Sequence, residues 1–118
     1  MTDRESFAPL VFFEYDHKPG SYCLMLSDSH MVEVDDVFTE CEQYGSGYGW
    51  EGVARSAVRE RAPELAGRFG YDSEAGMFVA YGEDPEALGR LGALLREAFG
   101  DRVLLKGLIE AGDPDWFD

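Results

Sequence analysis

A Pro-Gly pair between two apolar runs restricts the fold of this chain more than any other local feature. Residues 8–15 and 21–27 are rich in aromatic and aliphatic side chains, and the sequence Lys-Pro-Gly-Ser at 18–21 separates them. Proline and glycine stand at the second and third positions of a type II turn, where proline presets φ and glycine accepts a positive φ. The N-terminal part of the chain is therefore predicted to form a β-hairpin.

The remaining chain alternates helical patterns with a second hairpin. Apolar residues at helical spacing predict a short helix at about 34–43 and a second helix that starts at Trp50 and ends before Pro63. Strands are expected at 69–71 and 77–81, with Gly76 as the left-handed residue of the loop between them. Asp84 followed by Pro85 predicts the start of a third helix, and 103–109 form the last helix.

The predicted order ββααββαα defines an α+β fold. Its antiparallel sheet is built from two β-hairpins, with helices packed mostly on one face. No linker or repeat divides the chain, so residues 1–112 are expected to form a single domain. Residues 113–118 form an acidic aromatic tail. We expect this tail to fold back on the domain, because Trp116 and Phe117 are costly to leave in water, although binding of a partner by the tail itself stays open.

The charge of the chain excludes several kinds of partner. Its 10 basic and 24 acidic residues give a formal net charge of −14. Binding to nucleic acid or to an anionic membrane needs clusters of lysine and arginine that this chain lacks. The sequence therefore predicts no nucleic-acid and no membrane partner, and favours a basic protein partner.

The placement of the protein in the cell follows from weaker signals. Residues 3–5 mix charge signs, and the apolar run at 7–13 is short and interrupted by Pro9, so no secretory signal is expected. Cys23 and Cys41 are too few and too far apart for a zinc or redox motif. They are expected to be reduced thiols in the cytosol, although one disulfide between them stays open.

Catalytic, metal and cofactor chemistry are not expected. His17 at the tip of the first hairpin and His30 beyond its second strand would lie about 20 Å apart, too far for a shared site. In the glycine cluster 45–49, the frame starting at Gly45 has Trp50 where a dinucleotide fingerprint has its third glycine, and no strand precedes it. We interpret this cluster as a flexible break that lets Tyr48 and Trp50 pack tightly.

One segment has an uneven charge distribution. No lysine or arginine occurs between Pro19 and Ala54, whereas acidic residues are frequent there. A helix at 34–43 would turn its valines, Phe38 and Cys41 inward and its acidic residues outward. The candidate partner-binding residues are Glu33, Asp35, Asp36, Glu40, Glu42 and Glu51. The alternative interpretation is that this acidic face is only solvated. In the second helix, acidic and basic residues are mixed, and the pair Glu51 and Arg55 at i, i+4 suggests ordinary stabilisation of the helix.

Two segments resemble the Immunity protein 51 family of bacterial polymorphic toxin systems. They are Gly-Tyr-Gly-Trp-Glu-Gly-Val-Ala-Arg at 47–55 and Tyr-Asp-Ser-Glu-Ala-Gly-Met-Phe-Val-Ala-Tyr-Gly at 71–82, within a similarity over roughly 10–105. Ser73, where relatives are expected to have proline, departs from the pattern. The resemblance implies a small α+β protein that binds and neutralises a cognate toxin domain. It assigns no binding residues, and Tyr48, Trp50, Met77 and Phe78 are expected in the core rather than at an interface.

Charge and resemblance together suggest an immunity protein whose acidic surface binds a basic toxin domain. The toxin could be a nuclease. A non-catalytic regulatory or scaffold module is an alternative, and a small hydrolase with an acidic cleft is a further one. The sequence does not indicate the oligomeric state, the identity of the toxin, or whether inhibition blocks the toxin's active site.

Overall fold

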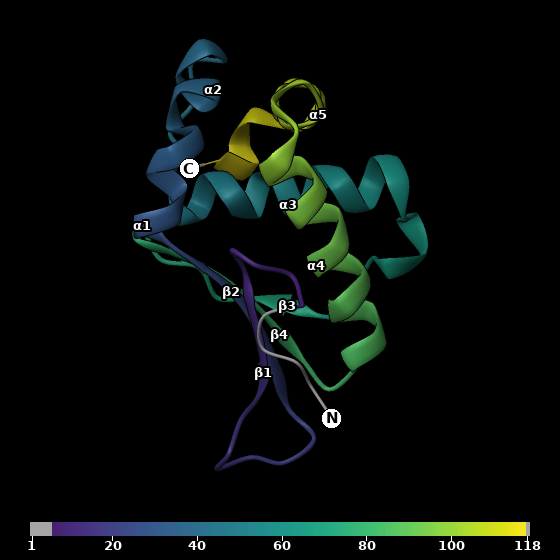
Figure 1. The fold of residues 1–118 in the computed structure, drawn as a ribbon. Coiled ribbons are helices and arrows are strands. Elements are labelled where there is room, and N and C mark those ends of the chain that lie inside the picture. The colour runs from purple at the N-terminus through teal and green to yellow at the C-terminus, as the bar shows by residue number, and fades with distance from the viewer. Residues whose placement is uncertain (1–5, 118) are drawn as a thin grey trace.

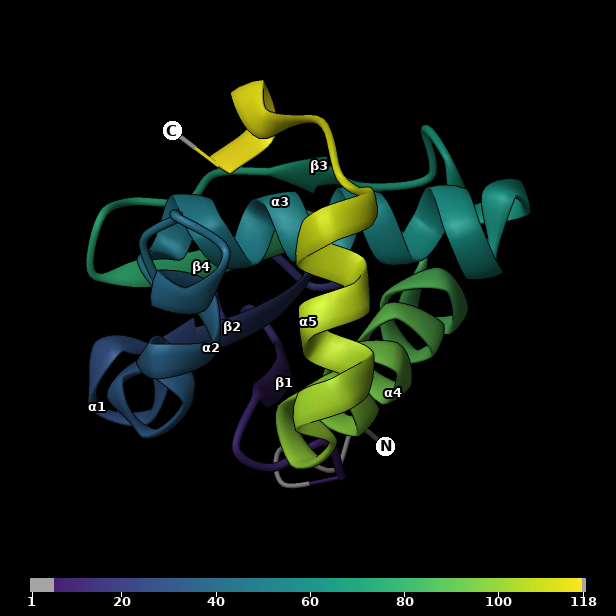
Figure 2. The ribbon, with the colours of Figure 1, turned by 90° about the horizontal axis from the view of Figure 1, so that it is seen from above.

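The computed structural model of the protein describes residues 6–117. Residues 3–5, on which the expectation of no secretory signal partly rests, and Asp118 of the predicted tail lie outside the described residues. Within the described part, the chain forms one four-stranded antiparallel sheet whose helices gather on one side (Figures 1 and 2). The predicted α+β fold class is therefore confirmed.

The sheet joins the two predicted hairpins through their inner strands. Its strand order is β1-β2-β4-β3, and all neighbouring strands are antiparallel. The strands are β1 (Val11–Glu14), β2 (Tyr22–Ser27), β3 (Gly70–Tyr71) and β4 (Met77–Gly82). Gly20 has a φ of 89°, and the Ser21 amide donates a hydrogen bond of 3.1 Å to the Lys18 carbonyl. The first hairpin therefore has the predicted type II turn.

The helical layer contains two helix-rich segments, each following a hairpin. The first comprises α1 (Asp28–Met31), the 3-10 turn η1 (Val32–Val34), α2 (Asp35–Glu40), α3 (Gly47–Arg61) and the 3-10 turn η2 (Pro63–Leu65). The second comprises α4 (Pro85–Gly100), α5 (Arg102–Ala111) and the 3-10 turn η3 (Pro114–Phe117). Asp84 caps α4 as predicted, because its carboxylate accepts a 3.0 Å hydrogen bond from the Ala87 amide. None of the helices within residues 6–117 combines the length and hydropathy of a transmembrane span.

The helix predicted at 34–43 has different ends in the structure. Helical backbone starts at Asp28 and continues through η1 into α2, which ends at Glu40. The early start is explained by Met31, which is buried and extends the helical spacing of Val34 and Phe38 backwards by one turn. The end is explained by Glu42, whose φ of 61° stops the helix.

The glycine cluster does not break the chain as expected. Ser46 caps α3, since its hydroxyl accepts a 3.1 Å hydrogen bond from the Gly49 amide, so the helix begins inside the cluster. The expectation for Gly76 is also wrong, because the left-handed glycines of the described chain lie elsewhere. Backbone hydrogen bonds between Glu74 and Met77 close the second hairpin with a tight two-residue turn that needs no left-handed residue.

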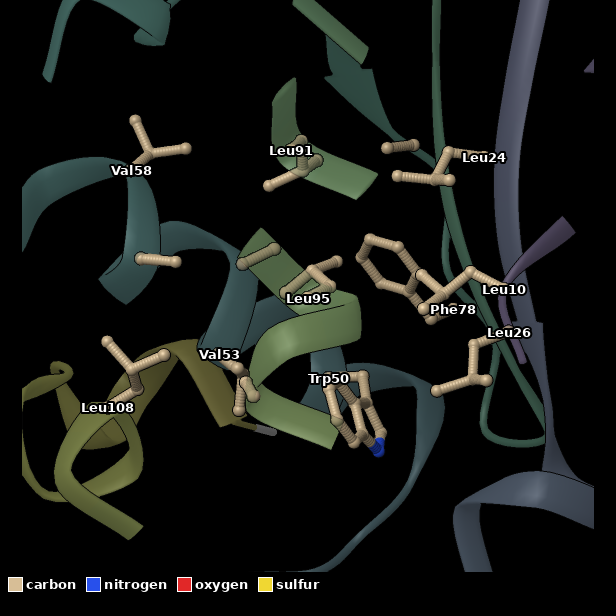
Figure 3. Packing of buried hydrophobic residues seen from close by; sticks show 14 of the residues in the cluster. Leu10, Leu24, Leu26, Trp50, Val53, Val58, Phe78, Leu91, Leu95 and Leu108 are labelled. Carbon is tan, nitrogen blue, oxygen red and sulfur yellow. The ribbon is translucent and has the colours of Figure 1, made fainter. Parts of the chain in front are cut away.

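The core lies between the sheet and the helices (Figure 3). Alternate strand residues, including Leu24, Leu26 and Phe78, point toward α3 and α4, as strand geometry requires. Trp50 is fully buried beside them and contacts Phe38, with ring centroids 5.7 Å apart. These contacts bind the hairpins, α2 and α3 into one hydrophobic cluster.

Candidate partner-binding site

The acidic segment predicted from the sequence forms an exposed helical edge. Val34, Val37 and Phe38 point inward and are at most 5% exposed, as predicted. The neighbouring carboxylates of Glu33, Asp35, Asp36, Glu40 and Glu42 are all exposed. Figure 1 shows α2 at one end of the molecule, near α5 and far from the turn of the first hairpin. We call the five carboxylates at 33–42 the acidic edge.

Two acids of this edge have a side-chain partner from a basic residue. Asp36 forms an ion pair with Arg102 at the start of α5, 66 residues away in sequence. Glu33 lies 3.1 Å from the Nδ1 atom of His30 on α1, and both side chains are about half exposed. Exposed pairs of this kind add little to stability, and the Arg102 pair reduces the charge that Asp36 offers to a partner.

The other three acids have no ion pair within residues 6–117. Asp35 accepts a 3.3 Å hydrogen bond from the Gly45 amide, which fastens the loop after α2. Glu40 borders a shallow hollow between α2 and α5 that also has Lys106 and Glu110 on its rim. Glu42 follows α2 with a left-handed backbone, where glycine is the usual residue. The edge therefore keeps a surplus of negative charge after pairing.

Glu51 has different surroundings from the acidic edge. Its Oε2 atom accepts hydrogen bonds of 3.4 and 3.1 Å from Arg55, one turn later in α3, which confirms the helix support predicted for this pair. Arg55 in turn lies over the ring of Tyr71 on β3, 4.7 Å from its centroid. The structure thus places Glu51 with the Arg55–Tyr71 pair, and its side chain is only 19% exposed.

Glycine spacing in α3 is a feature that the sequence analysis missed. The frame Gly47-x-Gly49-x-x-Gly52 matches a dinucleotide fingerprint, although the frame starting at Gly45 does not. A Cβ atom on Gly47 would lie 1.9 Å from the Glu74 carbonyl oxygen, so the start of α3 is covered by the second hairpin. A Cβ atom on Gly52 would lie 2.8 Å from the ring of Phe117. These glycines permit close packing, and the carbonyl oxygens that cover Gly47 would repel a phosphate.

The histidines and cysteines do not converge on a reactive centre in the described chain. His17 packs against Tyr15 in the first hairpin, with ring centroids 5.4 Å apart, while His30 pairs with Glu33. Within residues 6–117 no three His, Cys, Asp or Glu side chains are grouped to hold a metal ion. Both cysteines are free, and burial raises the pKa of each thiol, with a hydrogen bond from Tyr15 opposing this for Cys23. Raised pKa values disfavour the reactive thiolate.

The residues expected in the core divide into two groups. Trp50 and Phe78 are fully buried, as expected. Tyr48 is 39% exposed and Met77 is half-buried, so the expectation is wrong for Tyr48. Helix geometry explains the difference, because residues 48 and 50 of one helix point about 200° apart and only one of them can face the core.

These features define a class of small α+β protein that carries an exposed acidic edge on and beside α2. The chain belongs to the Immunity protein 51 family. The model of that family matches residues 10–114, which is nearly the whole chain. This family membership indicates a toxin-neutralising role, and immunity protein families are generally non-catalytic. The chain has no significant match among curated proteins or among solved structures.

Proposed function

We propose that this protein binds a basic toxin domain through the acidic edge and thereby neutralises it. The observation that supports the proposal most is the surplus of exposed, unpaired carboxylates on and beside α2, in a chain that belongs to an immunity family. Long-range attraction by such a surface accelerates encounter with a basic partner and selects against acidic ones. A nuclease fits this description, because a surface that binds phosphates is basic.

The backbone at Glu42 supports a role for this side chain beyond the fold. Its φ of 61° is the one left-handed angle at a non-glycine residue in the described chain. Glycine would adopt this angle without the cost of about 1 kcal/mol that a side chain adds. A glutamate at this position is consistent with selection for its charge at the surface.

The molecule is large enough for such an interface. A protein–protein interface of standard size buries about 800 Å² on each partner. The accessible surface of the chain is 6329 Å², so an interface of that size would cover roughly an eighth of it. The acidic edge would provide one part of this area, and Glu51 would contribute at most at its border.

Association kinetics with charge-reversed variants test the proposal. The partner is the cognate toxin domain, to be sought in the gene next to that of this protein, and the test variant is Glu40→Lys/Glu42→Lys, which leaves the Asp36–Arg102 pair intact. The matched control is Asp16→Lys/Glu83→Lys, which makes the same change in net charge around the first hairpin, far from α2 (Figure 1). We expect the association rate at low salt to fall about tenfold for the test variant and less than about twofold for the control.

Two results would count against this placement. Unchanged association by the test variant would show that the acidic edge does not meet the toxin. An equal loss in both variants would show that only the net charge matters, because the two variants differ in position and not in charge.

A further inference from the structure

A second surface, on the side of α3 that faces β3, differs in charge from the acidic edge. A hollow of about 310 Å³ lies between the C-terminal half of α3, the chain that follows it, β3 and η3. Apolar atoms of Val58, Leu65 and Phe69 contribute to its lining. Figure 2 shows β3 and η3 along the same side of α3, and the hollow is lined by residues of α3, of the chain that follows it, of β3 and of η3, so distant parts of the sequence form this site.

Two arginines border the hollow, each stacked on an aromatic ring. The guanidinium of Arg55 lies 4.7 Å from the ring centroid of Tyr71, and that of Arg59 lies 4.9 Å from the ring centroid of Trp116. The side chains of the two arginines are 41% and 48% exposed. Stacking fixes the guanidinium groups in place while leaving their edges accessible to a ligand.

Both arginines retain hydrogen-bonding capacity. Arg55 uses Nε and Nη2 on Glu51, whereas Arg59 uses Nε on Glu60 and Nη2 on the Ala111 carbonyl. The Nη1 group of each arginine has no protein partner within residues 6–117. Each Nη1 carries two N–H donors, so the rim offers directed donors for an anionic group.

The lining of this hollow is opposite in sign to most of the chain. It contains two arginines and no aspartate or glutamate, although the protein has a net charge of −14. Each arginine is ion-paired with a glutamate outside the lining, Arg55 with Glu51 and Arg59 with Glu60, so the rim offers a ligand its remaining N–H donors and a reduced positive charge. Other hollows of the described surface include acidic residues, such as Glu40 and Glu110 between α2 and α5 or Glu97 and Asp101 near α4. A hollow with an apolar lining and a cationic rim complements an apolar group that has a carboxylate beside it.

We propose that this hollow receives an aromatic or large aliphatic side chain of the toxin, flanked by a carboxylate that Arg55 and Arg59 bind. The inference rests on the proposed function for the identity of the partner. Buried anchors in pockets dominate the affinity of protein interfaces, with aromatic residues and arginine enriched among them. The toxin would then be recognised at two places of opposite charge, a basic patch on the acidic edge and an acid-flanked anchor in the hollow.

Binding of the toxin to matched arginine variants tests the proposal. Arg55→Gln/Arg59→Gln removes the charges while keeping polar side chains of similar reach. The control Arg61→Gln/Arg90→Gln removes two ion-paired arginines that do not line the hollow. We expect the dissociation constant to rise at least about tenfold for the first variant and less than about twofold for the control.

A second variant guards against a folding defect in the first. Ala66 is exposed at the border of the hollow, so Ala66→Trp fills the space and leaves both arginines in place. This variant is expected to weaken toxin binding as much as the arginine variant does, while circular dichroism and thermal unfolding stay close to the unmodified protein. Full toxin affinity in Ala66→Trp would overturn the proposal and leave the toxin-neutralising function intact.

Defined peptides test the hollow without the toxin. The probes are N-acetyl-Asp-Phe-Asp-amide and its charge-reversed counterpart N-acetyl-Lys-Phe-Lys-amide, and the signal is the indole N–H resonance of Trp116. We expect the acidic peptide to shift this resonance in a saturable way and the basic peptide to leave it unchanged at up to about 10 mM. Equal shifts, or no shift with either peptide, would overturn the proposal. If the toxin itself fails to bind the unmodified protein, the proposed function fails for that pairing. The peptide experiment still shows whether the hollow binds an apolar side chain flanked by carboxylates.

Discussion

Substituting Gly47 by alanine should destabilise the protein strongly, because the second hairpin lies directly on the start of α3. A Cβ atom at this position would lie 1.9 Å from the Glu74 carbonyl oxygen and 2.3 Å from that of Met77. Both are backbone atoms in a tight turn, so neither can rotate away as a side chain would. The Gly47 amide also donates a 2.9 Å hydrogen bond to the Ala75 carbonyl, which any separation of the two segments would weaken.

The magnitude follows from three contributions. Forcing an extra methyl into a packed site costs about 1–3 kcal/mol. Loss of the hydrogen bond to Ala75 adds about 1 kcal/mol. The better helix propensity of alanine offsets up to about 1 kcal/mol of this. The free energy of unfolding of Gly47→Ala should therefore fall by about 1–4 kcal/mol, which corresponds to roughly 4–16 °C in melting temperature for a chain of this length.

Urea unfolding followed by far-ultraviolet circular dichroism measures this difference. The control is Gly107→Ala in α5, where a Cβ atom would have no neighbour within 4 Å. That variant should gain about 0.5–1 kcal/mol, because helix propensity acts there without any clash. Equal effects of the two substitutions, or a Gly47→Ala protein as stable as the unmodified one, would refute the assignment of this glycine to close packing.

Three further predictions concern a strained residue, alkaline pH and the C-terminal turn. Glu42→Gly should raise the free energy of unfolding by about 1 kcal/mol while slowing toxin association; a stabilised variant with unchanged association would remove Glu42 from the interface. A hydrogen bond with Cys23 and, second, burial raise the pKa of Tyr15 to about 12, and burial raises that of Tyr71. Folding therefore favours the protonated phenols. Their contribution to stability is fully present below about pH 10 and is lost as the pH rises through the folded-state pKa values, so urea midpoints should fall between about pH 10 and 12, and flat midpoints would contradict this. Phe117 is 2% exposed, so Phe117→Ala should cost about 3 kcal/mol in urea unfolding, and an unchanged midpoint would show that η3 adds nothing to the core.

The parts of the fold that were predictable have local causes. The turn at Gly20 and the cap of α4 at Asp84 each depend on residues within a few positions of one another, and both are present. The helix boundaries that differ from the prediction also have local causes. Met31 extends the helical spacing before Val34, and Ser46 is a favourable N-cap before the last glycines of the cluster.

The candidate sites were only partly predictable, because their chemistry depends on contacts between distant segments. The acidic residues and their outward orientation follow from helical spacing around Phe38. The pairing of Asp36 with Arg102 does not, since the two residues are 66 positions apart. The same holds for the stacking of Arg59 on Trp116, which requires η3 to fold back onto α3.

Calorimetric titration of the protein with its cognate toxin domain, at low and at high salt, tests the central claim most directly. The account predicts one-to-one binding whose affinity decreases as salt is added, because part of the attraction comes from exposed carboxylates on the acidic edge. Binding that is indifferent to salt would contradict the role of that edge. Absence of binding to a folded, active toxin domain would contradict the toxin-neutralising function proposed for this pair.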